Sequence, residues 1–85
     1  MKSVQIYTRP MCPYCTRAKA LLQKKEVDFE ELDAFMNAQN RKEMIARSGG
    51  ARTYPQIFIG DTHVGGCDEL HAVEREGKLD ALLAE

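Results

Sequence analysis

Two cysteines, Cys12 and Cys15, are the residues of this chain whose type and spacing best suit chemistry. They lie in the sequence Cys-Pro-Tyr-Cys, after a short apolar run at 4–7 and before a stretch at 16–25 with helical periodicity. Two thiols at this spacing, at the junction between a strand and a helix, can exchange between a dithiol and a disulfide. The spacing therefore predicts a thiol–disulfide redox site.

Pro13 indicates where the helix begins and gives the two thiols different roles. Proline is favoured at the first position of a helix, so Cys12 is the expected N-cap. The backbone N–H groups of Tyr14 and Cys15 would then point at the Cys12 sulfur, and the helix dipole would favour a thiolate there. Helical periodicity turns Cys15 inward. We expect Cys12 to be an exposed nucleophile and Cys15 to be the resolving thiol.

The same pair could instead bind a metal ion or form a structural disulfide. Cys-x-x-Cys is also a spacing of zinc ligands, and Cys67 with His63 or His71 could complete such a site. A zinc site would be expected to have a second tight ligand pair, and His63-x-x-x-Cys67 is a poor one. A structural disulfide between Cys12 and Cys15 would close a loop too short for much entropic stabilisation. The sequence favours a redox pair and no metal site.

Length, charge and cysteine number limit the class of protein. A chain of 85 residues is long enough for one small domain, residues 1–85, and not for two. The formal net charge of −1, from 12 basic and 13 acidic residues, argues against nucleic acid or a membrane as the main partner. The three cysteines are an odd number, and no apolar run has the length of a signal peptide or a transmembrane helix. We expect a cytoplasmic protein and, by default, a monomer.

The remaining sequence predicts the elements that position the two thiols. Hydrophobic periodicity and breakers suggest strands or helices at 4–7, 13–25, 27–32, 37–48, 56–59, 62–64 and 67–76, with a short final helix or turn at 79–83. Gly60-Asp61 is the expected turn of a hairpin, and Cys67 or Asp68 the expected cap of the third helix. The order β-α-β-α-β-β-α requires a parallel pair joined by a crossover helix, followed by antiparallel strands.

Three segments, in this order and spacing, resemble the glutaredoxins, small oxidoreductases of the thioredoxin fold. They are Cys12-Pro13-Tyr14-Cys15, the run Thr-Tyr-Pro-Gln-Ile-Phe-Ile at 53–59, and Gly-Gly-Cys-Asp-Glu-Leu at 65–70. The resemblance covers essentially the whole chain and implies a thioredoxin-like α/β fold, with a central four-stranded mixed sheet flanked by helices. The Pro-Tyr pair resembles the dithiol branch of the family. Tyr54 departs from the valine that the family usually carries before the proline.

The resemblance implies a glutathione-dependent thiol–disulfide oxidoreductase. Such a protein reduces protein disulfides and glutathione mixed disulfides through Cys12 and Cys15, with glutathione as reducing co-substrate and no tightly bound cofactor. Two rivals remain open. One is a thioredoxin-like donor that a flavoprotein reductase recycles. The other is a module that holds an iron–sulfur cluster between two subunits through Cys12 and glutathione, which Pro13 would oppose by stiffening the loop.

The residues that the resemblance implies for glutathione binding are Arg9, Tyr14, Arg47, Thr53, Tyr54, Pro55, Gly66, Cys67 and Asp68. A cis Tyr54–Pro55 bond would leave the Tyr54 backbone free to pair with an extended thiol peptide. The amides of Cys67 and Asp68 would hold the γ-glutamyl carboxylate, and the Asp68 side chain its ammonium.

Several of these residues also have simpler interpretations. Tyr14 would form an apolar wall beside glutathione, and Arg9 or Arg47 would bind its glycyl carboxylate. Arg47 could equally be a helix-end charge that stabilises the helix dipole, and Asp68 an ordinary N-cap. Cys67 is expected to be a small, partly buried packing residue.

Overall fold

The computed structural model describes residues 1–84, and its elements follow the predicted order. They are β1 (Val4–Thr8), α1 (Pro13–Lys24), β2 (Glu30–Asp33), α2 (Ala38–Arg47), β3 (Gln56–Ile59), β4 (Thr62–Gly65), α3 (Cys67–Arg75) and α4 (Leu79–Leu83). No helix within residues 1–84 is both long and apolar enough to cross a membrane.

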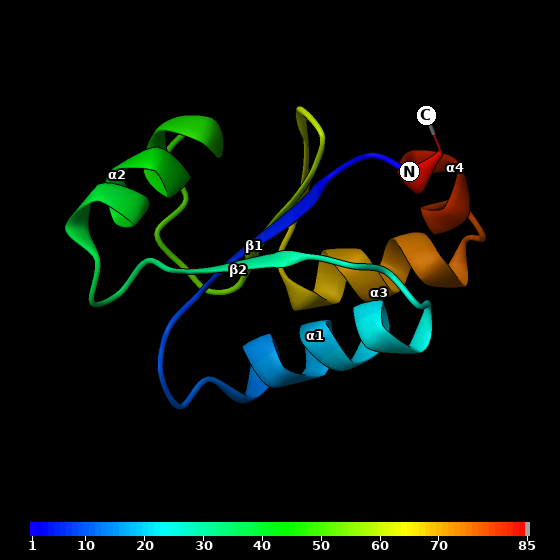
Figure 1. The fold of residues 1–85 in the computed structure, drawn as a ribbon, viewed down its shortest axis with the longest axis horizontal. Helices are drawn as coiled ribbons and strands as arrows, with labels where there is room; N and C mark the ends of the chain where they lie inside the picture. Colours follow the sequence, from blue (N-terminus) through cyan, green and yellow to red (C-terminus); the bar gives the residue numbers. More distant parts are fainter. Residues whose placement is uncertain (85) are drawn as a thin grey trace.

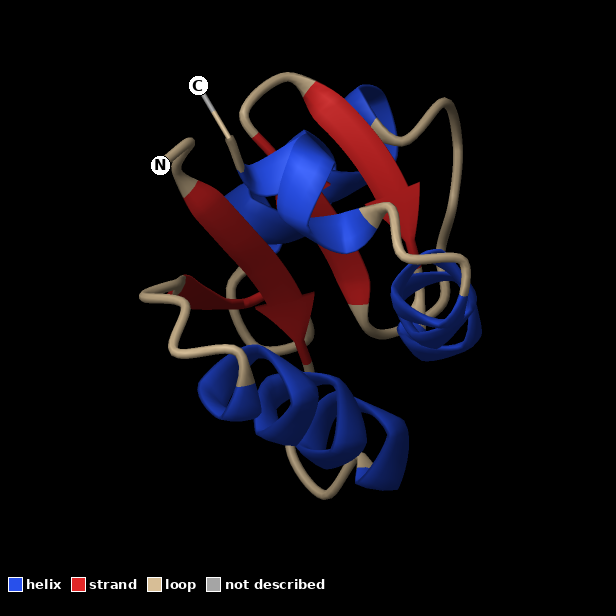
Figure 2. Cartoon of the chain, turned by 90° about the vertical axis from the view of Figure 1, so that its right-hand side faces the viewer, coloured by secondary structure: helices blue, strands red, loops and turns tan. Residues whose placement is uncertain are grey.

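The four strands form one sheet in the order β2-β1-β3-β4. The β1–β2 pair is parallel, whereas β1–β3 and β3–β4 are antiparallel, which confirms the predicted mixed sheet. Figure 2 shows the twist of the strands across this sheet. Helices α1 and α3 pack together on one face and α2 lies on the other (Figure 1).

Each face of the sheet has its own hydrophobic core. Because side chains alternate along a strand, Ile6 of β1 faces Leu22 of α1 and its neighbours, while the adjacent Tyr7 faces Met44 of α2. Phe58 of β3 joins the second core, where its ring meets that of Tyr7 edge-on with centroids 5.6 Å apart. The central strands are therefore buried on both faces, and they hold the loops at their ends in place.

The second strand begins later than the sequence predicts. Val27 is buried, but its N–H donates to Leu22 O at 3.0 Å, and Glu26 N–H donates to Gln23 O at 3.0 Å. Together with the positive φ of 58° at Glu26, these bonds form the Schellman motif that ends α1. The prediction of a strand from residue 27 was wrong because Val27 packs into the core as the residue that follows a helix end.

Candidate active site

The helix start places the two thiols as the sequence predicts. Cys12 is the N-cap of α1, with an extended backbone (φ −112°, ψ 103°), and Pro13 is the first residue of the helix. The Cys15 backbone N–H donates to Cys12 Sγ at 3.2 Å. Within residues 1–84 this is the hydrogen bond that the sulfur accepts, so the bond expected from the Tyr14 N–H is not formed. Cys12 and Cys15 are both free thiols.

Cys12 is less exposed than predicted. Its exposed fraction is 5%, against 2% for Cys15, so both thiols lie below the surface and Cys12 is the more accessible one. The expectation of an exposed tip was wrong, because Cys12 is buried at the N-cap of α1, directly after Met11 with its positive φ of 54°. The side chains of Met11 and Tyr14, on either side of Cys12 in the sequence, are exposed.

The environment of Cys15 keeps its thiol protonated. Burial, and after it the hydrogen bond with the Cys12 side chain, raise the pKa of Cys15 to about 12, while a backbone hydrogen bond with Arg9 acts in the opposite direction. Burial also raises the pKa of Cys67. Because the thiolate is the reactive form of cysteine, Cys15 and Cys67 are both poor nucleophiles at neutral pH. Cys12 is the remaining candidate.

A cavity of about 170 Å³ opens beside the thiols. It lies where the start of α1, the loop before β3 and the start of α3 converge (Figure 1). Its walls are formed by Tyr14, Thr53, Tyr54, Pro55, Gly66, Cys67, Asp68 and Glu69. The fold thus brings seven of the nine predicted binding residues around one cavity and adds Glu69.

The Tyr54–Pro55 peptide bond is cis, which confirms the prediction. The Tyr54 side chain packs against the core under α2, and its hydroxyl donates to Ala34 O at 3.0 Å. No group within residues 1–84 forms a hydrogen bond with the backbone N–H or C=O of Tyr54. These two backbone groups, which belong to a residue that lines the cavity, are therefore available to a ligand.

The start of α3 differs from the prediction by one residue. Gly66, and not Cys67 or Asp68, is the N-cap, with an extended backbone (φ −96°, ψ −161°). A Cβ atom at Gly66 would lie only 3.2 Å from Pro55 O, so glycine is what allows α3 to approach the loop before β3 this closely. The amides of Cys67 and Asp68 fall in the first turn of α3, where N–H groups have no partner within the helix.

Glu69 is a residue of the site that the sequence analysis missed. Its Oε1 atom accepts a hydrogen bond from the Gly66 N–H at 2.6 Å, and its side chain lines the cavity. A glutamate three residues after an N-cap is half of a capping box, and that spacing could have identified it. The capping box was not recognised in the sequence, since its N-cap residue is usually serine or threonine and is glycine here.

Arg9 and Arg47 do not line the cavity. The Arg9 side chain is exposed, and its guanidinium donates to Pro10 O at 3.4 Å. The Arg47 guanidinium donates to Gln5 Oε1 at 2.6 Å and to Tyr7 Oη at 2.9 Å, and lies over the Phe58 ring. Arg47 therefore contacts the strands under α2. Arg9 instead lies in the loop between β1 and α1, three residues before Cys12.

The alternative zinc set is not assembled. Residues 1–84 contain no group of three or more His, Cys, Asp or Glu side chains that could hold a metal ion. His63 stacks on Phe58 and bonds to Gln56 Oε1 at 2.7 Å. His71 instead contacts Cys67, with its Nδ1 2.9 Å from the Cys67 carbonyl oxygen and 3.5 Å from Sγ.

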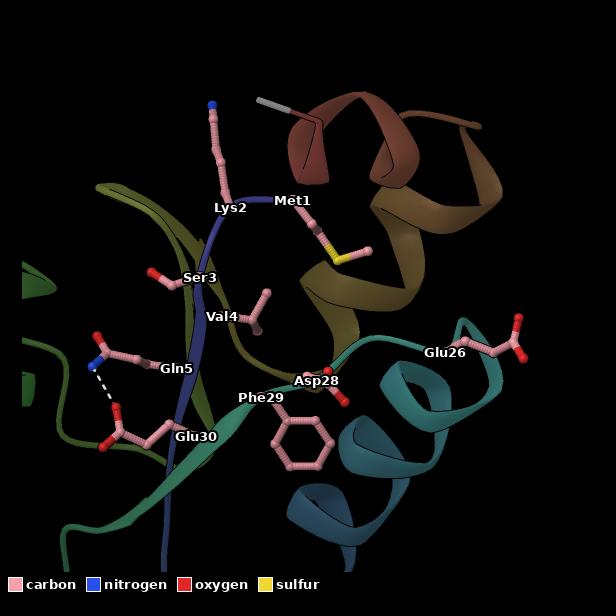
Figure 3. Close-up of a pocket in the computed structure, with 9 residues that line it drawn as sticks. All are labelled: Met1, Lys2, Ser3, Val4, Gln5, Glu26, Asp28, Phe29 and Glu30. Carbon is pink, nitrogen blue, oxygen red and sulfur yellow. Dashed lines mark hydrogen bonds between the residues drawn. The ribbon is translucent and has the colours of Figure 1, made fainter.

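A larger hollow of about 600 Å³ lies at the other end of β1 (Figure 3). It is lined by Met1, Lys2, Ser3, Val4, Gln5, Glu26, Asp28, Phe29 and Glu30. Gln5 spans part of it by donating to Glu30 Oε1 at 2.9 Å. No cysteine is among these lining residues, whereas Cys12 and Cys15 follow the opposite end of β1.

A thioredoxin-like α/β domain with a dithiol at the first turn of its first helix is a redox protein by fold and by site. The family model for glutaredoxins matches residues 4–64. The chain belongs to the glutaredoxin family.

Relatives and solved structures agree with this assignment. The chain is 60% identical to a glutaredoxin of Pseudomonas aeruginosa, over 99% of each chain, and 57% identical to glutaredoxin 3 of Escherichia coli K12, over 98% of this chain and 99% of that one. The solution structure of a glutaredoxin from Brucella melitensis is 61% identical, with a TM-score of 0.83 over 98% of this chain and 89% of that one. A crystal structure of a buckwheat glutaredoxin–glutathione complex has a TM-score of 0.84 at 27% identity, over 96% of this chain and 76% of that one.

Proposed function

We propose that this chain is a glutathione-dependent thiol–disulfide oxidoreductase of the dithiol type, which reduces protein disulfides and glutathione mixed disulfides. The observation that carries the proposal is the hydrogen bond from Cys15 N–H to Cys12 Sγ, at a helix start beside the cavity. An N–H donor and the helix dipole stabilise negative charge on the Cys12 sulfur. Cys12 is the nucleophile and Cys15 the resolving thiol.

Reduction of a protein disulfide uses both cysteines. The Cys12 thiolate attacks one sulfur of the disulfide, the S–S bond breaks, and the departing thiolate takes a proton. Cys15 then loses its proton, attacks Cys12 Sγ, and releases the second substrate thiol, which leaves a Cys12–Cys15 disulfide. Two glutathione molecules reduce this disulfide in two successive exchanges and leave as glutathione disulfide, so the electrons balance.

Removal of glutathione from a glutathionylated protein needs Cys12 alone. Cys12 attacks the glutathionyl sulfur, and the protein thiol leaves and takes a proton. A second glutathione then attacks the Cys12–glutathione disulfide, which releases glutathione disulfide and restores the Cys12 thiolate. Cys15 makes no bond in this cycle, so it is dispensable for it.

Glutathione would bind in the cavity beside the thiols. The amides of Cys67 and Asp68 donate to the γ-glutamyl carboxylate, since N–H groups at a helix start bind anions, and the Asp68 carboxylate holds the ammonium group. The free Tyr54 backbone groups pair with the cysteinyl residue of glutathione, whose sulfur then faces Cys12. The exposed Arg9 is the better placed of the two candidate arginines for the glycyl carboxylate.

The remaining lining residues shape the cavity. Thr53 and Pro55 form the wall on the side of β3, Gly66 leaves room between that wall and α3, and Tyr14 covers the side of α1. The buckwheat relative that is solved as a complex with glutathione supports glutathione as the ligand. We further propose that the protein acts as a monomer in the cytoplasm, without a tightly bound cofactor.

A coupled assay with two cysteine variants tests the proposal. The wild type is expected to reduce both a glutathione mixed disulfide and a protein disulfide at the expense of glutathione. Cys12→Ser should lose both activities, whereas Cys15→Ser should keep the first and lose the second. Turnover by Cys12→Ser would show that the wrong nucleophile was assigned. Reduction of the Cys12–Cys15 disulfide by a flavoprotein reductase and not by glutathione would favour a thioredoxin-like donor instead.

A further inference from the structure

The short loop between β2 and α2 exposes two large apolar side chains. Phe35 has an exposed fraction of 54% and Met36 of 73%. Within residues 1–84 the other exposed large hydrophobic side chains are Met1, Met11 and Tyr14. Met11 and Tyr14 flank Cys12 in the sequence, so four of these five side chains belong to loops or helix starts at the thiol end of the sheet.

The backbone of this loop is held firmly although its side chains are exposed. Asp33 Oδ1 accepts hydrogen bonds from the N–H groups of Phe35 and Met36, both at 2.8 Å. Arg41 Nη1 donates to Phe35 O at 2.8 Å. These bonds hold the backbone of the loop in place, so a partner that contacts the two side chains loses little conformational entropy in ordering the loop.

Two further bonds join the loop to the segments that form the site. Ala34 N–H donates to Thr8 O at 2.9 Å, next to the loop that leads to Cys12. The Tyr54 hydroxyl donates to Ala34 O at 3.0 Å, and the Tyr54 backbone lines the cavity. Because β1 and β2 are parallel, the segments that follow these two strands leave the sheet at the same edge, as Figure 1 shows.

We propose that Phe35 and Met36 form a docking ledge for the polypeptide part of a protein substrate whose disulfide Cys12 attacks. This proposal rests on the proposed function and extends it. The ledge would make the protein prefer disulfides whose cysteine has apolar neighbours in the substrate sequence. The occupant is a polypeptide with apolar residues near its cysteine, since the loop of Phe35 and Met36 leaves the sheet at the same edge as the segment that leads to Cys12. Glutathione binding does not depend on the ledge, because its γ-glutamyl end pairs with the amides and carboxylate at the start of α3 and its glycyl carboxylate pairs with Arg9.

Two matched peptides test the ledge. Each carries a glutathionylated cysteine, flanked by leucines in one peptide and by serines in the other. The wild type should turn over the leucine peptide with a kcat/KM about 10-fold higher, as burial of one large apolar side chain predicts. The variant Phe35→Ser/Met36→Ser should lose this preference and keep its kcat/KM for the mixed disulfide of glutathione and 2-mercaptoethanol.

The control is Lys24→Ser, which changes an exposed residue in the last turn of α1, away from the thiols, and should behave as the wild type on all three substrates. Since Phe35 and Met36 are exposed, the double variant should unfold at the wild-type temperature. Equal kcat/KM for the two peptides in the wild type, or an unchanged preference in the double variant, would overturn the ledge. No turnover of the small mixed disulfide by the wild type would overturn the proposed function and the ledge with it.

Discussion

The Cys15 backbone N–H donates a hydrogen bond to Cys12 Sγ at 3.2 Å, so one cysteine stabilises negative charge on the other without using its own sulfur. The same donor serves Cys12 when it attacks as a thiolate and when it leaves as a thiolate, as glutathione removes the glutathionyl group from it. The Cys15 sulfur experiences the opposite environment, because burial and the neighbouring Cys12 raise its pKa to about 12. One helical turn thus gives two identical side chains two different roles.

The raised pKa of Cys15 predicts how stability depends on pH. The pKa is raised from 9.0 to about 12 in the folded protein, so the folded state holds a proton that the unfolded state loses between these values. The stabilisation is complete below the unfolded pKa and disappears as pH rises through the folded pKa. We expect the free energy of unfolding of the reduced wild type to fall toward that of Cys15→Ala from about pH 9 to about pH 12.

Urea unfolding of both proteins in a strong reductant measures this convergence. The variant is the control, since it lacks the Cys15 thiol and keeps every other titratable side chain. A difference in free energy that stays constant over the range would show that the Cys15 pKa is not raised by folding.

The two glycines before α3 should respond differently to alanine. Gly65 has a φ of 120°, and a Cβ atom there would lie 2.8 Å from Glu69 Cγ, so Gly65→Ala should cost roughly 1–3 kcal/mol of stability. A Cβ atom at Gly66 would press on the Pro55 carbonyl, so Gly66→Ala should raise the KM for glutathione. Thermal unfolding and steady-state kinetics measure the two effects.

Gly49→Ala is the matched control for these variants. Gly49 also has a positive φ, of 73°, but a Cβ atom there would meet nothing within 4 Å. This variant should lose only about 1 kcal/mol of stability, which is the cost of a side chain at a positive φ, and it should keep the wild-type KM for glutathione. A KM for Gly66→Ala equal to that of Gly49→Ala would show that the narrow gap at Pro55 has no part in binding.

The Glu69 carboxylate should stabilise the turn before α3. It accepts the Gly66 N–H at 2.6 Å, and it lies in the first turn of the helix, where negative charge is favourable. Glu69→Ala should lower stability by about 1 kcal/mol and raise the KM for glutathione, whereas Glu69→Gln keeps the acceptor and should recover most of both. A glutamine variant as impaired as the alanine variant would assign the effect to charge instead of the hydrogen bond.

The two candidate arginines can be separated by stability and KM. Arg47 donates to Gln5, Tyr7 and Gly60 O, and stacks on Phe58 at 4.1 Å, so Arg47→Ala should lower stability by about 1 kcal/mol. Arg9→Ala should leave the unfolding temperature unchanged and raise the KM for glutathione. A rise in KM for Arg47→Ala alone would assign the glycyl carboxylate to Arg47.

Much of the fold could be predicted because its information is local. Breakers and caps mark where helices begin and end, and they act within a few residues, as Pro13 and Asn37 show at the starts of α1 and α2. Val27 misled the prediction, since a buried apolar residue after a helix end has the same pattern as the start of a strand.

The sequence by itself determined that two thiols lie one turn apart at a helix start, and its resemblance to a known family predicted nine binding residues, of which seven line one cavity in the structure. Only the tertiary structure decided how deeply Cys12 is buried, that Arg47 binds Gln5 and Tyr7, and that Phe35 and Met36 stand exposed beside the site. The reason is the range of the forces involved. Capping and helix polarity depend on neighbours in the chain, whereas burial and the partners of long side chains depend on which distant segments the fold brings together.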